Sequence, residues 1–256
     1  MTTSSLRLEN ATVVVNQGTS EEKTILDAVN LEVQAGEFVT VLGSNGAGKS
    51  TLFNVIAGTL NLTSGKIYLG DTDVTHLKEI ERTHILARVF QDPKLGTAPR
   101  MTVAENLLMA ERRGQKRRLK SRGLTTEKRA EMAQVADKMG NGLAQRLDVA
   151  TGQLSGGQRQ ALAFLMATEK RPELLLLDEH TAALDPKTSA QLMALTDEQI
   201  KAQQLTAMMI THNLSDALQY GNRLLVMSEG KIAMDVDGTA KQALTLEDML
   251  AFFNRY

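Results

Sequence analysis

One short stretch constrains this chain more than any other: the apolar run FVTVL is followed directly by the glycine-rich segment GSNGAGKST, residues 43–51. This segment fits the pattern G-x-x-x-x-G-K-[ST], and the residues after it have the apolar spacing of a helix. A strand, a glycine loop and a helix in this order aim backbone N–H groups and the positive end of a helix dipole at one point. The stretch therefore predicts an α/β fold with a phosphate-binding loop, although a tight glycine turn in a Rossmann-like domain fits the same letters.

Size and composition exclude several other classes of protein. The 256 residues are enough for one large α/β domain, or for a domain with a smaller appendage. The net charge of −1 gives no overall attraction to nucleic acid or anionic lipid, and without cysteine no disulfide or thiolate site is possible. The N-terminus lacks the pattern of a secretory signal, and no window reaches the ~18 apolar residues of a membrane span. We therefore expect a protein that stays in the cytosol.

The order of apolar and polar segments predicts the organisation of the chain. The first forty residues have the pattern of strands, SGKIYLGDTDVT that of a hairpin, and RLLVMSEGKIAMDVDG that of a second hairpin turning at Glu229-Gly230. The segment from about Val103 to Gly142 is polar and favours helix, which indicates a helical insertion. TLEDMLAFFNRY is expected to close the chain as a short helix capped by Thr245.

Two motifs supply the groups that a phosphate chain needs. In the glycine loop, Lys49 is placed to reach β- and γ-phosphates, and the Ser50 hydroxyl to bind Mg²⁺. The leucines of LLLLDE fit a buried parallel strand, so Asp178 and Glu179 emerge at the strand end where α/β sheets bind ligands. We expect Asp178 to hold Mg²⁺ and Glu179 to polarise a water molecule toward the γ-phosphate. An apolar run that ends in two acids is also a common way for a strand to leave the core.

A second glycine-containing segment, LSGGQ at residues 154–158, also opens a helix and offers free N–H groups. It is therefore a second candidate anion site. One chain rarely needs two such sites for a single phosphate chain, and two copies that face each other across a dimer account for both.

The motifs GSNGAGKST, LSGGQ, LLLLDEH, AALD and ITHN occur in this order, and with them the sequence from about Leu6 to Gly238 resembles the ATP-binding cassette of ABC transporters. The resemblance implies an α/β fold of the P-loop NTPase class, with an N-terminal antiparallel β subdomain and an inserted α-helical subdomain. It implies one nucleotide-binding domain over residues 1–256, with the helical subdomain at about 92–160 and a C-terminal hairpin and helix at 228–256.

The resemblance also assigns roles residue by residue. Glu179 takes the position of the catalytic base, His212 in ITHN that of the switch histidine, and Gln91 in VFQD that of a glutamine that contacts Mg²⁺ and the attacking water. Asp185 in AALD takes the position of the aspartate that links the two sites of a dimer. The residues expected to contact ATP are Gly43, Ser44, Asn45, Gly46, Ala47, Gly48, Lys49, Ser50, Thr51, Ser155, Gly156, Gly157, Gln158 and Asp185. Those expected to bind Mg²⁺ are Ser50, Gln91 and Asp178.

Partners follow from the same resemblance. Two ATPase subunits bind ATP head to tail, so that Ser155, Gly156 and Gly157 of one subunit touch the γ-phosphate held by the glycine loop of the other. Permease subunits are separate chains, and an extracytoplasmic solute-binding protein acts through them. These partners imply a peripheral protein on the cytoplasmic side of the cell membrane. DEHTAALDP and RVFQDPKLGTAPRMTVAENL resemble the tryptophan/tyrosine-type branch of bacterial importers, which depend on a substrate-binding protein. This implies import of an amino acid or a related small organic solute.

Two positions depart from the family pattern. Val15 stands where an aromatic residue usually stacks on adenine, so we expect the nucleobase to be bound more weakly or less selectively. His180 stands where proline often follows the catalytic base. The sequence assigns His180 no role.

Other functions fit the sequence less well. A non-transport ABC ATPase that acts on DNA or ribosomes would have long coiled-coil arms or a second cassette, and a kinase or GTPase leaves LSGGQ unexplained. A module that binds nucleotide without hydrolysing it does not need Glu179 and His212. The basic run from Arg112 to Arg122 has seven Lys or Arg among eleven residues, but no aromatic residue interrupts it. It therefore fits a solvated face better than a nucleic-acid or lipid site, and we expect no nucleic acid partner.

Overall fold

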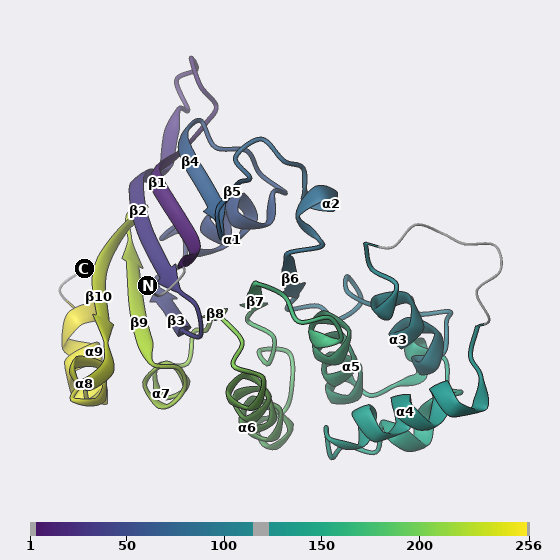
Figure 1. The fold of residues 1–256 in the computed structure, drawn as a ribbon. Helices are drawn as coiled ribbons and strands as arrows, with labels where there is room; N and C mark the ends of the chain where they lie inside the picture. The colour runs from purple at the N-terminus through teal and green to yellow at the C-terminus, as the bar shows by residue number, and fades with distance from the viewer. Residues whose placement is uncertain (1–3, 115–122, 255–256) are drawn as a thin grey trace. The chain divides into compact units, whose positions relative to one another are not determined.

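The computed structural model describes residues 4–114 and 123–254 (Figure 1). The chain forms two compact units, which are described separately below. The first consists of Met1–Leu86, Glu173–Glu179 and Gln204–Tyr256, and the second of Ala87–Pro172 and His180–Gln203. Among the described residues, no helix combines the length and the apolar character that a membrane crossing requires.

The first unit contains an antiparallel sheet with strand order β2-β1-β4-β5. Its strands are β1 (Ser4–Val15), β2 (Lys23–Gln34), β4 (Ser64–Leu69) and β5 (Thr72–Asp73). β4 and β5 form the hairpin that SGKIYLGDTDVT predicts, with Leu69 opposite Thr72. The fold class expected from the sequence, with its N-terminal antiparallel sheet, is confirmed.

A second sheet of the first unit places the strand ends that carry the predicted motifs side by side. β3 (Phe38–Gly43) pairs in parallel with β8 (Ala207–Ile210) and with β9 (Arg223–Ser228), and β7 (Leu174–Asp178) pairs in parallel with β8. β10 (Lys231–Asp237) returns antiparallel to β9 through the predicted turn at Glu229-Gly230. Because β3, β7 and β8 run in one direction, their carboxyl ends meet at one edge of the sheet.

The helices of the first unit cover these sheets. They are α1 (Lys49–Ala57), α2 (Glu79–Arg82), α7 (Leu214–Gln219), α8 (Gly238–Gln242) and α9 (Leu246–Phe253). Leu52, Phe53 and Ile56 of α1 are fully buried in a core shared with both sheets, which fixes the helix that follows the glycine loop. Near the C-terminus, Met249 of α9 packs with Leu42 and Leu224, and Thr245 caps this helix as predicted (Figure 1).

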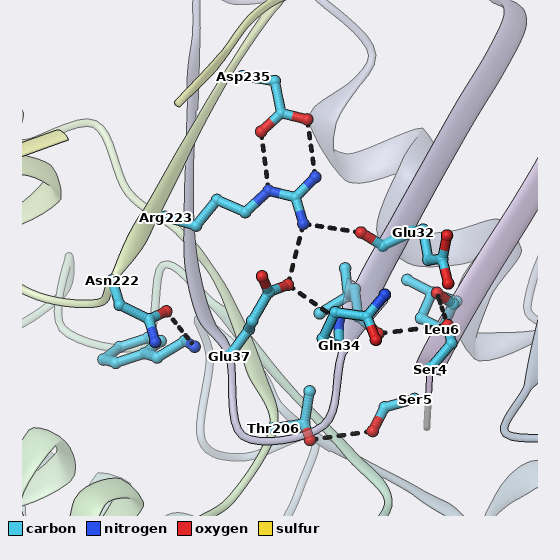
Figure 2. Close-up of polar contacts among 12 residues, drawn as sticks. Ser4, Ser5, Leu6, Glu32, Gln34, Glu37, Thr206, Asn222, Arg223 and Asp235 are labelled. Carbon is cyan, nitrogen blue, oxygen red and sulfur yellow. Dashed lines mark hydrogen bonds and ion pairs between the residues drawn. The ribbon is translucent and has the colours of Figure 1, made fainter. Parts of the chain in front are cut away.

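Polar contacts join the two sheets at the amino ends of the parallel strands (Figure 2). Arg223 binds both carboxylate oxygens of Asp235 at 2.8 and 2.7 Å, and it donates to the Glu37 carboxylate at 2.9 Å and the Glu32 carbonyl at 2.7 Å. The hydrogen bonds that Arg223 donates to the Asp235 carboxylate raise the pKa of the Arg223 guanidinium. This arginine therefore ties β9 and β10 to the chain between β2 and β3, remote from the strand ends that carry the motifs.

The second unit is mainly helical. Its helices are α3 (Val103–Glu111), α4 (Thr126–Asp137), α5 (Gly156–Thr168) and α6 (Pro186–Gln203), with short 3-10 turns at Ala144–Arg146 and Thr151–Gln153. The strand β6 (Leu86–Val89) leads into it from the first unit. Asn106 of α3 is fully buried and satisfied, because it accepts from the Ala98 N–H and donates to the Thr102 carbonyl. Most of the predicted basic run, Gln115–Arg122, lies outside the described residues.

Candidate functional site

The glycine loop between β3 and α1 depends on two glycines that no other residue could replace without strain. Gly43 has φ 153°, and an added Cβ would lie 2.5 Å from the Met227 carbonyl oxygen. Gly48 has φ 101°, and its Cβ would lie 2.9 Å from the Ile25 carbonyl oxygen. The backbone therefore passes very close to β9 and β2 here, which allows the chain to turn sharply from the strand into the helix.

Lys49 holds the loop together from inside. Its side chain is only 5% exposed, and its Nζ donates to the carbonyl oxygens of Gly43 at 2.6 Å and Ser44 at 3.0 Å. Burial lowers the pKa of the Lys49 ammonium, whereas the negative charge of Glu179 opposes this effect. The lysine thus fixes the two ends of the loop relative to α1, with its charge under the loop.

The amino end of α1 is open to an anion. Gly48 is the N-cap, it has no side chain to cap the helix, and the first turn contains no acidic residue. The N–H groups of this turn therefore keep their hydrogen-bonding capacity and their positive dipole end for a bound phosphate. Ser50 in the same turn is exposed, so its hydroxyl is available beside the same anion.

A cavity of about 320 Å³ lies over this loop within the first unit. The predicted residues that line it are Asn45, Gly46, Ala47, Gly48, Lys49, Ser50, Thr51, Glu179 and His212. The structure therefore brings the loop, the predicted base and the predicted switch histidine around one space. Gly43 and Ser44 contribute through their carbonyl contacts to Lys49.

Glu179 and His212 contact each other in the lining of this cavity. Glu179 follows β7, and its N–H donates to the Ile210 carbonyl at 3.1 Å, while its side chain is 14% exposed. His212 follows β8, and its Nε2 lies 2.5 Å from Glu179 Oε1. Glu179 has φ 47°, a left-handed conformation that costs a residue with a Cβ energy and that clusters at functional sites. The strained backbone therefore aims the carboxylate from the strand end into the cavity.

Asp178 occupies the last position of β7, opposite Ile210 of β8. It is half-buried and is not among the residues that line the cavity. Its predicted role as a magnesium ligand is not tested by this arrangement and stays a prediction.

The remaining predicted site residues lie in the second unit, where they form helix caps. Ser155 is the N-cap of α5: its Oγ accepts from the Gln158 N–H at 3.2 Å, and Gln158 Oε1 accepts from the Ser155 N–H at 3.3 Å. Asp185 accepts from the Thr188 N–H at 3.1 Å at the start of α6, and hydrogen bonds from Thr188 lower the pKa of Asp185. Gln91 follows β6 and is exposed. The roles of these three residues toward nucleotide stay predictions.

The amino ends of α5 and α6 lie against each other within the second unit. A Cβ added to Gly157 would lie 2.4 Å from Thr188 Cγ2, and one added to Gly156 would lie 3.3 Å from Leu184 Cδ2. A side chain at Gly157 would therefore clash with Thr188, whereas one at Gly156 would press on Leu184 only slightly, so packing favours the glycine at 157 in addition to any role toward a ligand. The predictions from sequence did not include this contact, because it joins segments about thirty residues apart in sequence.

Two further residues of the cavity were not predicted. Lys23 and Ile25, both from β2, line it beside the loop. No local pattern in the sequence marks them, because their position depends on how β2 pairs and packs. His180, to which the sequence assigns no role, is buried in the structure. It is 2% exposed, its Nε2 lies 3.3 Å from Thr196 Oγ1, and burial lowers its pKa to about 4.

The sheet with its parallel strand ends, the glycine loop and the uncapped α1 define a P-loop nucleoside triphosphatase. Residues 26–182 match the family described as ABC transporter. The chain belongs to this family, and it is an ATP-binding and ATP-hydrolysing subunit of an ABC transporter.

Similar proteins agree with this family over nearly the whole chain. A tyrosine transport ATP-binding protein of Clostridioides difficile (strain R20291) is 43% identical, covering 97% of this chain and 98% of that protein. A thiamine import ATP-binding protein, ThiQ of Yersinia pseudotuberculosis serotype I (strain IP32953), is 37% identical over 85% of this chain and 89% of its own. The dimeric post-hydrolysis state of the ATP-binding cassette MJ0796, bound to ADP and Pi, is 27% identical, with a TM-score of 0.74 over 91% of this chain and 98% of that chain.

Proposed function

We propose that this ATPase powers the import of an amino acid of the tyrosine type, or of a closely related small organic solute. The observation that carries the proposal is the 43% identity to the tyrosine transport ATP-binding protein, which extends over 97% of this chain. The import ATP-binding protein for thiamine supports the direction of transport. Identity of this extent in the ATPase supports a shared type of transporter. The solute itself is bound by other chains, so the choice of solute is the part of the proposal that the uptake experiment tests.

The cavity supports a defined sequence of bond changes. The phosphates of ATP accept hydrogen bonds from the N–H groups of the loop and of the first turn of α1. The positive charge of Lys49 offsets their negative charge. Glu179 takes a proton from a water molecule while the water oxygen bonds to the γ-phosphorus. The bond from that phosphorus to the β–γ bridging oxygen breaks, which leaves ADP and inorganic phosphate. His212, at 2.5 Å from Glu179, orients the carboxylate and faces the γ-phosphate.

The donors near the loop fit Mg²⁺ as the metal. Ser50 offers a hydroxyl that is exposed at the first turn of α1, and Asp178 offers a carboxylate at the end of the adjacent β7. Both are oxygen donors, which Mg²⁺ prefers, and the amide of Gln91 in the second unit is a third predicted oxygen donor. Held by these donors, Mg²⁺ would supply positive charge that offsets the negative charge developing on the phosphates.

The second candidate anion site, LSGGQ at residues 154–158, supports a head-to-tail homodimer. We propose that Ser155, Gly156 and Gly157 of one subunit contact the γ-phosphate bound in the other, and that Asp185 links the two sites. The dimeric MJ0796 cassette, with ADP and Pi, supports this arrangement. We further propose a single nucleotide-binding domain over residues 1–256, whose helical subdomain at about 92–160 couples through Gln91 to separate permease subunits. An extracytoplasmic solute-binding protein acts through those permeases, and the ATPase lies on the cytoplasmic side of the membrane.

Uptake of labelled tyrosine tests the proposed function. Cells that lack this gene should lose high-affinity uptake, and a copy of the gene should restore it. A copy with Glu179→Gln should not restore it, because this variant keeps the shape of the site and lacks the base. Unlabelled tryptophan and thiamine serve as competitors that separate amino acid transport from the vitamin transport of the ThiQ relative. Unchanged tyrosine uptake in the deleted strain would refute the proposed solute.

A further inference from the structure

A lysine at the start of β2 is one of the residues that line the cavity over the glycine loop. Lys23 is the first residue of β2, and its partner across the antiparallel pair with β1 is Val15. Val15 is the residue that stands in place of an adenine-stacking aromatic side chain. Lys23 lines the cavity over the glycine loop, whereas Val15 is not among the lining residues. The strand pair thus supplies an ammonium group to this space and no aromatic ring.

The position of Lys23 beside the phosphate loop follows from the packing of β2. Lys23 and Ile25 are two residues apart on β2, and both line the cavity. The Ile25 carbonyl oxygen lies 2.9 Å from the point where a Gly48 Cβ would be, so β2 lies directly against the start of α1. Thr51 of that helix lines the same cavity. Lys23 therefore lies beside the phosphate loop, paired on the strand with Val15.

The charge of Lys23 is available to a ligand. Its side chain is exposed, and among residues 4–114 and 123–254 it makes no hydrogen bond or ion pair. By contrast, Lys231 of the same unit pairs with the Asp27 carboxylate at 2.9 Å. An ammonium group on a flexible four-carbon stem, without a partner and beside an anion site, is complementary to a phosphate oxygen.

We propose that Lys23 is a nucleotide-binding residue that contacts the phosphate chain near its α-phosphate. Because Val15 gives the nucleobase no aromatic surface, this contact shifts recognition from the base to the phosphates, and the site binds nucleotides of different bases with similar affinity. The inference rests on the proposed nucleotide site around the glycine loop.

Equilibrium titration with nucleoside diphosphates tests the contact without hydrolysis. ADP, GDP and CDP, each with Mg²⁺, are titrated into the full-length protein and into the variant Lys23→Gln. The variant should bind all three roughly fivefold more weakly, as expected for one solvent-exposed charge contact, and the difference should shrink at high salt. Lys23→Arg keeps the charge and should retain most of the affinity. The matched control is Lys66→Gln, which removes the charge of an exposed lysine on β4 that does not line the cavity.

Each outcome decides one point. Equal weakening for the three bases, with little effect of Lys66→Gln, supports the phosphate contact. Unchanged affinities in Lys23→Gln, an effect confined to ADP, or an equal effect of Lys66→Gln would overturn it. Wild-type protein that binds none of the three nucleotides would refute the proposed nucleotide site itself, and circular dichroism of each variant checks that the fold is intact.

Discussion

Replacing Arg82 with methionine should strongly destabilise the helix that carries the glycine loop. The Arg82 side chain is 1% exposed, and its Nη1 donates to the Val55 and Ile56 carbonyl oxygens, each at 2.7 Å. Its Nε donates to the Leu77 carbonyl at 3.0 Å. Val55 and Ile56 lie in the last turn of α1, where carbonyl oxygens lack partners within the helix and the dipole is negative. Arg82 therefore closes the carboxyl end of this helix from inside the core.

The expected loss of stability follows from the buried carbonyl groups that lose their hydrogen-bond donor when Arg82 is replaced. The Val55 carbonyl keeps the Gly58 N–H at 3.3 Å, whereas the carbonyls of Ile56 and Leu77 lose their donor. Each such loss costs about 1–3 kcal/mol, so the two together cost about 2–6 kcal/mol. The described carbonyl contacts give the guanidinium no negative countercharge, and burial lowers the pKa of Arg82, so removing the charge returns part of that cost. Methionine fills most of the same volume, which limits any cavity. We expect a net loss of about 3 kcal/mol in the free energy of unfolding.

Urea unfolding followed by far-UV circular dichroism measures this loss, since the chain has no tryptophan to report by fluorescence. The matched control is Arg7→Met in the same unit, where a half-exposed arginine pairs with Glu9 on the surface. This control should change stability by less than ~1 kcal/mol. Arg82→Met with a loss no larger than that of Arg7→Met would refute the view that Arg82 stabilises the end of α1.

Four further variants test the site and its surroundings. Glu179→Gln should lower ATP turnover at least ~100-fold and keep ATP binding, and turnover equal to wild type would remove Glu179 from the role of base. Lys49→Ala should lose most nucleotide affinity in an ATP titration, and unchanged affinity would contradict its role under the phosphates. Val15→Tyr should bind both ADP and GDP roughly fivefold more tightly, because a ring stacks on either purine, and unchanged affinities would contradict the assignment of the base position. Burial lowers the pKa of His180 from 6.5 to about 4, so as pH falls the unfolded chain binds a proton on this imidazole before the folded chain does. This difference should lower the free energy of unfolding of wild type by about 3 kcal/mol between pH 6.5 and pH 4. In urea titrations in metal-free buffer, His180→Gln should lose less over this window, and parallel losses would contradict the buried neutral imidazole.

The parts of the fold that the sequence predicted are those that depend on neighbouring residues. The α1 helix begins at the glycine loop, as predicted, and ends before Gly58, which adopts φ 82°. The hairpin at Glu229-Gly230 and the cap of α9 at Thr245 follow from turn and capping chemistry within a few residues. Glycine positions, apolar runs and caps act over one turn or one strand, so they can be identified without the tertiary structure.

The parts that the sequence did not predict depend on contacts between distant segments. Nothing near Arg82 indicates that a residue of this type is buried, because its partners on α1 lie about 26 positions earlier. Lys23 reaches the cavity only because β2 pairs with β1 and packs against Gly48. Glu179, the first residue after the buried strand β7, adopts a left-handed conformation. The preceding residues LLLLD indicate the strand, but they do not indicate this conformation. Side chains positioned by register and packing therefore require the structure.

The capping role of Ser155 bears on the proposed dimer, because one hydroxyl must then serve both a helix and a phosphate. A serine hydroxyl has one donor and two acceptor positions. As the N-cap of α5, Ser155 uses its oxygen as an acceptor for the Gln158 N–H, so its own proton stays free, and the side chain is exposed. The cap holds the oxygen in place, and the free O–H can donate to a γ-phosphate oxygen of a partner subunit without breaking the helix end. The geometry that stabilises α5 in one subunit is therefore compatible with the proposed contact to nucleotide across the dimer.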